Sequence, residues 1–188
     1  TQSISAEVIG FRNEKNLIAM HQSDSNVRIG SKVRLISDGV NVPVGKELLG
    51  RVLDAMGNPL DNKKSLITNE QWPLYGKTIN PLQRNKVEEP FDVGVRSINS
   101  LVTIGIGQRI GIIAGSGVGK SILLQMMSKY SDADVVVVGL IGERAREVKT
   151  MVETLKKYDE HNKIIIIAVP ADRSPLLRMK GANRCTAI

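Results

Sequence analysis

The stretch from Arg109 to Tyr130, RIGIIAGSGVGKSILLQMMSKY, constrains the fold of this chain more than any other segment. The apolar run at 110–114 predicts a buried strand, and a glycine-rich segment, 115–121, follows it directly. Apolar residues then recur at helical spacing: Ile122, Leu123, Met126, Met127 and Tyr130. A strand, a glycine loop, Lys-Ser and a helix in this order are the arrangement of a phosphate-binding loop.

The residue types in this loop suit a bound phosphate chain. Glycines let successive backbone N–H groups approach an anion, and the start of the helix adds a partial positive charge. Lys120 supplies a mobile charge for the outer phosphates, and the Ser121 hydroxyl can ligate the magnesium that accompanies ATP. The alternative is a structural glycine turn with a solvated lysine. The predicted nucleotide-binding residues are Ala114 (where the usual pattern has its first glycine), Gly115, Ser116, Gly117, Val118, Gly119, Lys120, Ser121 and Ile122.

The rest of the C-terminal half alternates between apolar strands and amphipathic helices. Strands are predicted at 135–141 and 163–169, with helices around 148–155 and 174–188. Aromatic residues make up only 3% of the chain, so Val, Ile and Leu must build the core, which suits a parallel sheet covered by helices. We therefore expect an α/β domain over residues 94–188.

The N-terminal part has a different pattern. Residues 1–70 contain short apolar runs separated by turn signals about ten residues apart, as in a small all-β barrel. Residues 71–93 are punctuated by three prolines without a clear period and are predicted to be a linker. No catalytic group of residues stands out in the predicted barrel, so a structural or assembly role is favoured there.

A second chemical feature follows the strand at 135–141. Ligands of open α/β sheets bind beyond the carboxyl ends of the strands, which is where Glu143 is expected. A carboxylate there can hold the water that attacks a γ-phosphoryl group, and Arg144 could orient Glu143 or contact a phosphate. A Glu-Arg pair at the start of the next helix is an equally good interpretation from the pattern alone.

Charge and composition limit the other classes of function. The net charge is +7 and lies mostly in residues 94–188, which is compatible with nucleic acid or an anionic membrane surface. The basic residues form no run of five and lack interleaved aromatics, so a nucleotide site with a solvated surface or subunit contact is favoured. The single cysteine, Cys185, excludes an internal disulfide. The chain begins at Thr1 and ends inside a predicted helix, and we expect both ends to be cut.

Several blocks together resemble one family. GQRIGIIAGSGVGKS, ADVVVVGLIGERAREV and PADRSPLLRMKGA resemble the ATPase of the flagellar and type III secretion export apparatus. That family is similar to the catalytic subunit of rotary F-type and V-type ATPases. LLGRVLDAMGNPLD resembles the end of their N-terminal barrel, and PLQRNKVEEPFDVGVRSINSLVTIGIGQR the entry to their nucleotide domain. The residues of two blocks, VVGLIGER and PADRSPLLRMKGA, favour the flagellar branch of this family.

This resemblance implies a P-loop NTPase domain with a RecA-like parallel sheet, present here only in part, after the N-terminal barrel. It matches Lys120 and Ser121 to the family's phosphate loop, with Mg²⁺ bound together with ATP, and Glu143 to its catalytic glutamate. Ala145 departs from the family, which usually has Gly after Glu-Arg. The Walker B strand, the arginine finger and the C-terminal domain would follow Ile188, so the fragment alone is expected to be inactive and monomeric.

The function that the resemblance implies is ATP hydrolysis that powers protein export, in a homohexameric ring. The implied partners are a stator-like regulator, a central stalk, an export gate, and export substrates with their chaperones. The implied location is the cytoplasmic face of the inner membrane, with peripheral association and no nucleic acid. Two alternatives remain. An RNA-translocating hexamer would need stacking aromatics, but Phe11 is the only aromatic residue before position 71. A non-catalytic rotary subunit would not be expected to carry Glu143.

Overall fold

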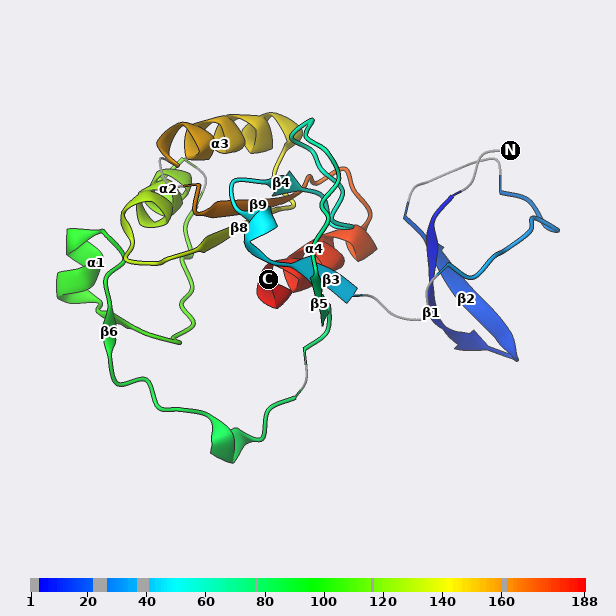
Figure 1. The fold of residues 1–188 in the computed structure, drawn as a ribbon, viewed down its shortest axis with the longest axis horizontal. Coiled ribbons are helices and arrows are strands. Elements are labelled where there is room, and N and C mark those ends of the chain that lie inside the picture. Colours follow the sequence, from blue (N-terminus) through cyan, green and yellow to red (C-terminus); the bar gives the residue numbers. More distant parts are fainter. Residues whose placement is uncertain (1–3, 22–26, 37–40, 77, 116, 160–161) are drawn as a thin grey trace.

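The computed structural model describes residues 4–21, 27–36, 41–76, 78–115, 117–159 and 162–188 (Figure 1). Its centre is a parallel three-stranded sheet in the order β4–β9–β8. Helix α3 packs on one face of this sheet and α4 on the other. The bounds of these elements are β4 Val52–Leu53, β8 Val136–Ile141, α3 Ala145–Tyr158, β9 Ile164–Val169 and α4 Pro175–Ala187.

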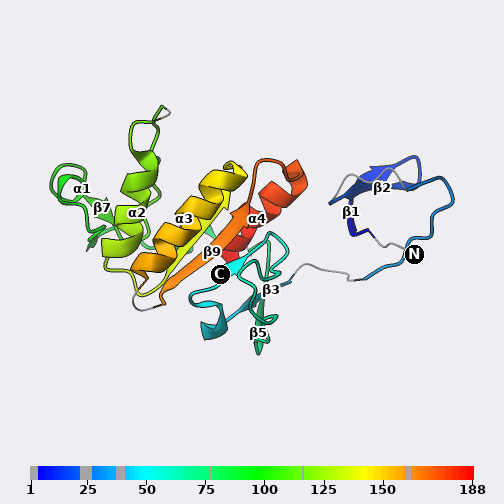
Figure 2. The same cartoon turned by 90° about the horizontal axis from the view of Figure 1, so that it is seen from above.

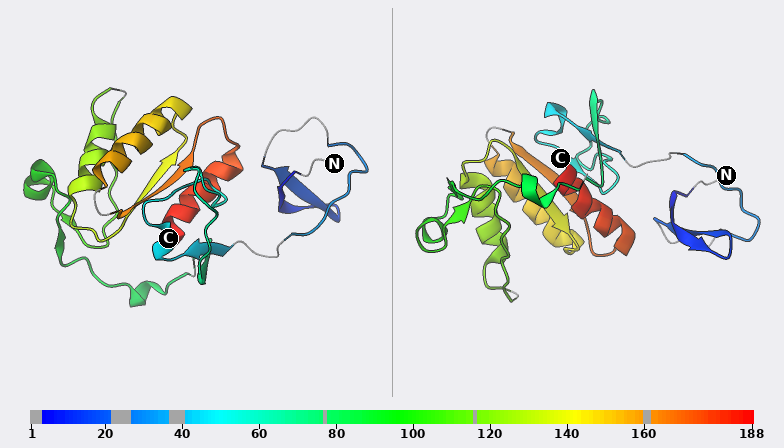
Figure 3. Two further views of the ribbon diagram at one scale, coloured as in Figure 1. Left: turned by 45° about the horizontal axis from the view of Figure 1, so that its top comes forward. Right: turned by 90° about the horizontal axis from the view of Figure 1, so that it is seen from below.

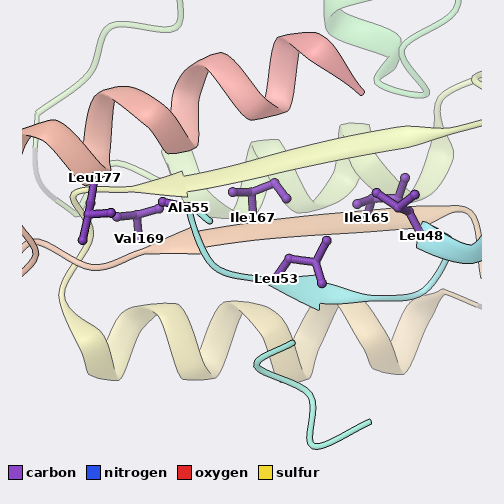
Figure 4. Packing of buried hydrophobic residues seen from close by; sticks show 7 residues of the cluster. All are labelled: Leu48, Leu53, Ala55, Ile165, Ile167, Val169 and Leu177. Atoms are coloured by element: carbon purple, nitrogen blue, oxygen red, sulfur yellow. The ribbon is translucent and has the colours of Figure 1, made fainter. Parts of the chain in front are cut away.

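Strand β9 is the middle of the core, and all six of its residues are buried. Its alternate side chains Ile165, Ile167 and Val169 pack toward α4, together with Leu177 (Figure 4). The other three face α3 and pack against Val148 and Leu155. A strand that is covered on both faces needs an unbroken apolar sequence, which explains the run IIIIAV. The two strands and two helices predicted for residues 135–188 are confirmed.

Helix α2 (Lys120–Tyr130) packs at a second, smaller cluster with α1 (Arg96–Leu101). The strand pair β6 (Pro90–Phe91) and β7 (Ile104–Gly105) completes this region. Only part of the predicted apolar face of α2 is covered. Leu123 and Met127 pack against the cluster, whereas three residues of the predicted face are exposed: Ile122, Met126 and Tyr130.

The strand predicted at 110–114 is not present. Residues 108–115 have no strand pairing, and the Ile113 side chain is fully exposed. A strand needs a neighbouring edge for its backbone hydrogen bonds. Among the described residues, β8 pairs only with β9, and no strand bridges the sheet to residues 110–114. The apolar sequence of the segment is therefore a strand sequence without a partner.

The first 70 residues contribute to three different sheets. β1 (Ala6–Arg12) and β2 (Lys15–Met20) form an antiparallel hairpin, which lies beside α4 (Figure 3). β3 (Asn41–Val44) pairs with β5 (Glu70–Pro73). β4 joins the parallel sheet instead, although the predicted barrel range includes it. No sheet among the described residues closes into a barrel. Short 3₁₀ turns occur at Lys46–Leu48 and Pro81–Gln83.

The pairing of β4 with β9 shows why the boundary differs. Gly50 N–H donates to Ile164 O (3.0 Å), and Ile166 N–H donates to Arg51 O (2.9 Å). Val52 and Leu53 are both buried between the layers. A two-residue apolar run between turns predicts a strand, but the pattern does not say which sheet receives it.

Candidate nucleotide-binding site

The glycine loop leads into α2 through two residues in the left-handed region. Gly117 has φ 78° and Gly119 has φ 102°, conformations that side-chain-bearing residues rarely adopt. An added Cβ would meet no atom at either position, so glycine is required there by backbone conformation and not by crowding. Ser116, also predicted to bind nucleotide, lies outside the described residues.

Gly119 is the N-cap of α2, and its carbonyl accepts the N–H of Leu123 at 3.0 Å. It has no side chain to bond the first N–H groups of the helix. Lys120 and Ser121 occupy the first two helical positions and are exposed. An uncapped helix start with a lysine and a hydroxyl at its first turn can receive an anion. Ala114, Val118 and Ile122 are exposed beside it.

Glu143 lies directly beyond β8. The turn begins at Gly142, whose φ is 79° and whose N–H donates to Val169 O at 2.8 Å. The carbonyl of Glu143 accepts the N–H of Ala171 at 2.9 Å, so the loops after β8 and β9 are bonded to each other. The partly buried Glu143 is thus fixed at the carboxyl edge of the sheet.

Arg144 is the N-cap residue of α3, and its carbonyl accepts the N–H of Val148 at 3.0 Å. Its guanidinium lies 3.9 Å from the carboxylate of Glu147, and 71% of its side chain is exposed. Within the described residues its ion-pair partner is Glu147 and not Glu143. These contacts agree with the helix-start interpretation of the Glu-Arg pair, in which Arg144 does not orient Glu143.

The starts of three helices lie along one edge of the sheet. Figure 2 shows the N-terminal ends of α2, α3 and α4 on the same side. At α4 the cap is Ser174, whose Oγ accepts the N–H of Leu177 at 3.4 Å. The glycine loop and Glu143 therefore share the edge where ligands of α/β sheets bind.

The residues at this edge fit a magnesium ion that arrives with a nucleotide. Within the described part of the chain, no three His, Cys, Asp or Glu side chains form a metal-binding group. Mg²⁺ on a nucleotide usually takes one or two protein oxygens and completes its shell with phosphates and water. The exposed hydroxyl of Ser121 in the first turn of α2 can provide one such oxygen.

Two buried cations on α4 were missed by sequence reasoning. Lys180 is 3% exposed and pairs with Glu7 of β1 at 2.8 Å. Arg184 is 2% exposed and donates from Nε to the Ala55 carbonyl at 3.0 Å. Both partners are far away in the sequence, and no local pattern predicts these contacts.

In the described regions, no helix is both long and apolar enough to cross a membrane.

Comparison with known proteins gives one family. Residues 94–188 match the model of the ATP synthase alpha/beta family, nucleotide-binding domain. Curated relatives include the flagellum-specific ATP synthases of Pseudomonas aeruginosa, 44% identical over 98% of this chain, and of Salmonella typhimurium, 45% identical over 100% of this chain. The chain spans 41% and 43% of these two relatives.

Solved structures give the same result. The assembled ATPase EscN from the type III secretion system of enteropathogenic E. coli is 37% identical, with a TM-score of 0.85. The match covers 97% of this chain and 44% of EscN. EscN in complex with its central stalk EscO matches with a TM-score of 0.84 at 38% identity, over 96% of this chain and 45% of that one. With a family model over half of its length and a glycine loop placed at the start of α2, the chain belongs to the ATP synthase alpha/beta family.

Proposed function

We propose that this chain is part of an ATP-hydrolysing subunit that powers protein export through a flagellar or type III secretion apparatus. One observation carries the proposal: Lys120 and Ser121 open α2 behind a left-handed Gly119, on the same sheet edge as Glu143. The flagellum-specific relatives, similar over nearly the whole chain, support the export assignment.

Each residue has a defined task in this proposal. The N–H groups of the loop and Lys120 hold the phosphates of ATP. Ser121 holds the magnesium, which neutralises charge on the phosphates. Glu143 orients the attacking water and accepts its proton. Arg144 is left with a structural role at the start of α3, because its described contact is to Glu147.

The finer architecture is also a proposal. The domains would be an N-terminal barrel within residues 1–70, from which β4 is excluded, a linker at 71–93 and the first part of a RecA-like domain at 94–188. Residues 78–90 are exposed wherever they are described, which supports a linker there. The family's Walker B strand would lie beyond Ile188. The arginine finger and C-terminal domain would also lie beyond Ile188.

The proposed assembly is a homohexamer at the cytoplasmic face of the inner membrane. EscN is described as an assembled ATPase and as a complex with its central stalk EscO, which supports a ring and a stalk partner. A stator-like regulator, an export gate, substrates and chaperones follow from the same resemblance. The relatives do not favour an RNA translocase or a non-catalytic subunit.

Steady-state hydrolysis by the full-length protein tests the site. Lys120→Ala and Glu143→Ala should each lower kcat by about 100-fold or more, because phosphate contacts and water activation act in the transition state. The matched controls are Lys149→Ala and Glu153→Ala, an exposed ion pair on α3. Near-normal turnover by either site variant overturns the assignment. Stimulation by RNA would favour the translocase instead.

A further inference from the structure

A cluster of three polar side chains lies where the β1–β2 hairpin meets α4. Lys180 Nζ on α4 is 2.8 Å from Glu7 Oε2 on β1, and the lysine side chain is only 4% exposed. His21, directly after β2, places its Nε2 3.9 Å from the same Glu7 oxygen, with 9% of its side chain exposed. The backbone N–H of His21 donates to the backbone carbonyl of Ser5 at 3.1 Å, which holds this histidine at the base of the hairpin.

The hairpin has little apolar contact with the rest of the molecule. Among the described residues, the buried hydrophobic core contains no residue of β1 or β2. Ile9 and Phe11 are largely exposed, and Leu17 is 43% exposed. Within the described part of the chain, docking of the hairpin on α4 therefore depends on charge more than on buried apolar surface, and the ion pair between Glu7 and the buried Lys180 joins the two elements.

The charges of this cluster are balanced only while His21 is neutral. Glu7 carries one negative charge and Lys180 one positive charge. Protonation of His21 would add a second cation beside Lys180 with no second carboxylate. Glu7 Oε2 and His21 Nε2 also make no well-directed hydrogen bond within the described structure. A buried charge without a partner is costly, and undocking the hairpin would return it to water.

We propose that Glu7, Lys180 and His21 form a proton-sensitive latch that holds the N-terminal hairpin on α4 at neutral pH and releases it on acidification. The latch also links the hairpin to the candidate site, because α4 begins at the sheet edge that carries Glu143. While the latch is closed, the hairpin is held against a helix that starts at this edge.

The direction of the pH effect follows from the surroundings of His21. Desolvation and the Lys180 charge lower the pKa of His21 below 6.5, while Glu7 offsets this only in part. Within the described residues, these are the charged groups that act on it. The docked state thus binds fewer protons than the undocked state. Docking is fully stable above about pH 6.5 and weakens as the pH falls toward the lowered pKa, by at most about tenfold per pH unit for one proton.

Energy transfer between two dyes can follow the hairpin in the 188-residue chain. Asn16→Cys on β2 and Thr150→Cys on α3 place labels at exposed positions of the hairpin and the body. Burial raises the pKa of the Cys185 thiol to about 11, so it stays protonated while the introduced cysteines are labelled at pH 7.5. Transfer efficiency is then measured between pH 8 and 5.5.

The expected result is a fall in transfer on acidification that is lost in His21→Gln. His161→Gln, which changes the chain's other histidine, is the matched control and should behave like the parent. Lys180→Met should give low transfer at every pH, and Glu7→Gln should do the same if Lys180→Met does not fold. The proposal is overturned if the parent shows no pH dependence, if His21→Gln keeps it, or if both latch variants stay docked.

Discussion

Arg51 and Asp61 secure the chain at the entrance to β4. The Arg51 Nε donates to Asp61 Oδ2 at 2.7 Å, and its Nη2 donates to Oδ1 and to the Lys64 carbonyl. The same carboxylate accepts the backbone N–H groups of Val52 and Lys63. Burial alone would raise the pKa of Asp61, but these hydrogen bonds outweigh it and lower the pKa to about 2.

We predict that Asp61→Asn lowers the free energy of unfolding by about 2 kcal/mol at pH 7. A depressed carboxyl pKa stabilises the fold above its unfolded value of 3.8, and this contribution is lost as the pH falls through 2. Urea denaturation of the parent and the variant at pH 7 and at pH 3 measures the loss of unfolding free energy at each pH, with the exposed Asp132→Asn as control. An equal effect of Asp61→Asn at the two pH values would contradict the hydrogen-bonded carboxylate.

At the scale of elements, α4 lies tightly against the sheet at Gly181. A Cβ placed there would lie 2.5 Å from Val169 Cγ2 and 2.9 Å from Ile141 Cδ1, side chains of β9 and β8. Gly181 is buried within the helix, where alanine would otherwise be favoured. The contact distance between α4 and the sheet therefore depends on the missing side chain.

Gly181→Ala should destabilise the chain by about 1 kcal/mol or more. Overpacking costs about 1–3 kcal/mol, which exceeds the gain of up to about 1 kcal/mol from helix propensity. Ala182→Gly, at the exposed neighbouring position, isolates the propensity effect and should cost about 1 kcal/mol. The urea midpoints of the two variants, compared with that of the parent, separate overpacking from helix propensity. A stabilised Gly181→Ala would contradict overpacking and would show that α4 can move away from the sheet.

The spacing of apolar residues correctly predicted the helices and strands whose packing partners lie close to them in the sequence. Strands β8 and β9 and helices α3 and α4 form one continuous unit, and their apolar spacing reports the faces they bury. The same pattern predicted a strand at 110–114 that does not form, because pairing needs a neighbouring edge and none of the strands in the described ranges offers one. It could not assign β4 to a sheet whose other strands lie about a hundred residues later.

The candidate site was predictable for a related reason. Glycine conformation and a helix start are both local properties, so the sequence could place Gly119, Lys120 and Ser121 at the start of a helix. That these residues bind phosphate stays a prediction. Contacts of Arg144, Lys180 and Arg184 depend on side chains brought together by the fold, and sequence left them open or missed them.

At the scale of the whole molecule, the chain spans about two-fifths of the relatives it matches. If the family's remaining catalytic residues lie beyond Ile188, the 188-residue chain should release no phosphate from ATP and should be monomeric. Light scattering on a sizing column and a phosphate-release assay test both statements. A stable hexamer or sustained turnover by this chain would contradict the proposed division of the site.

The central claim is that the loop at 114–121 binds ATP and that Glu143 acts in hydrolysis rather than in binding. Calorimetric titration of the full-length protein with Mg-ATP tests it most directly. We predict that Glu143→Gln binds ATP as the parent does, whereas Lys120→Ala binds about tenfold more weakly or not at all, a loss of at least about 1.4 kcal/mol. The claim is contradicted if Lys120→Ala binds as tightly as the Lys149→Ala control.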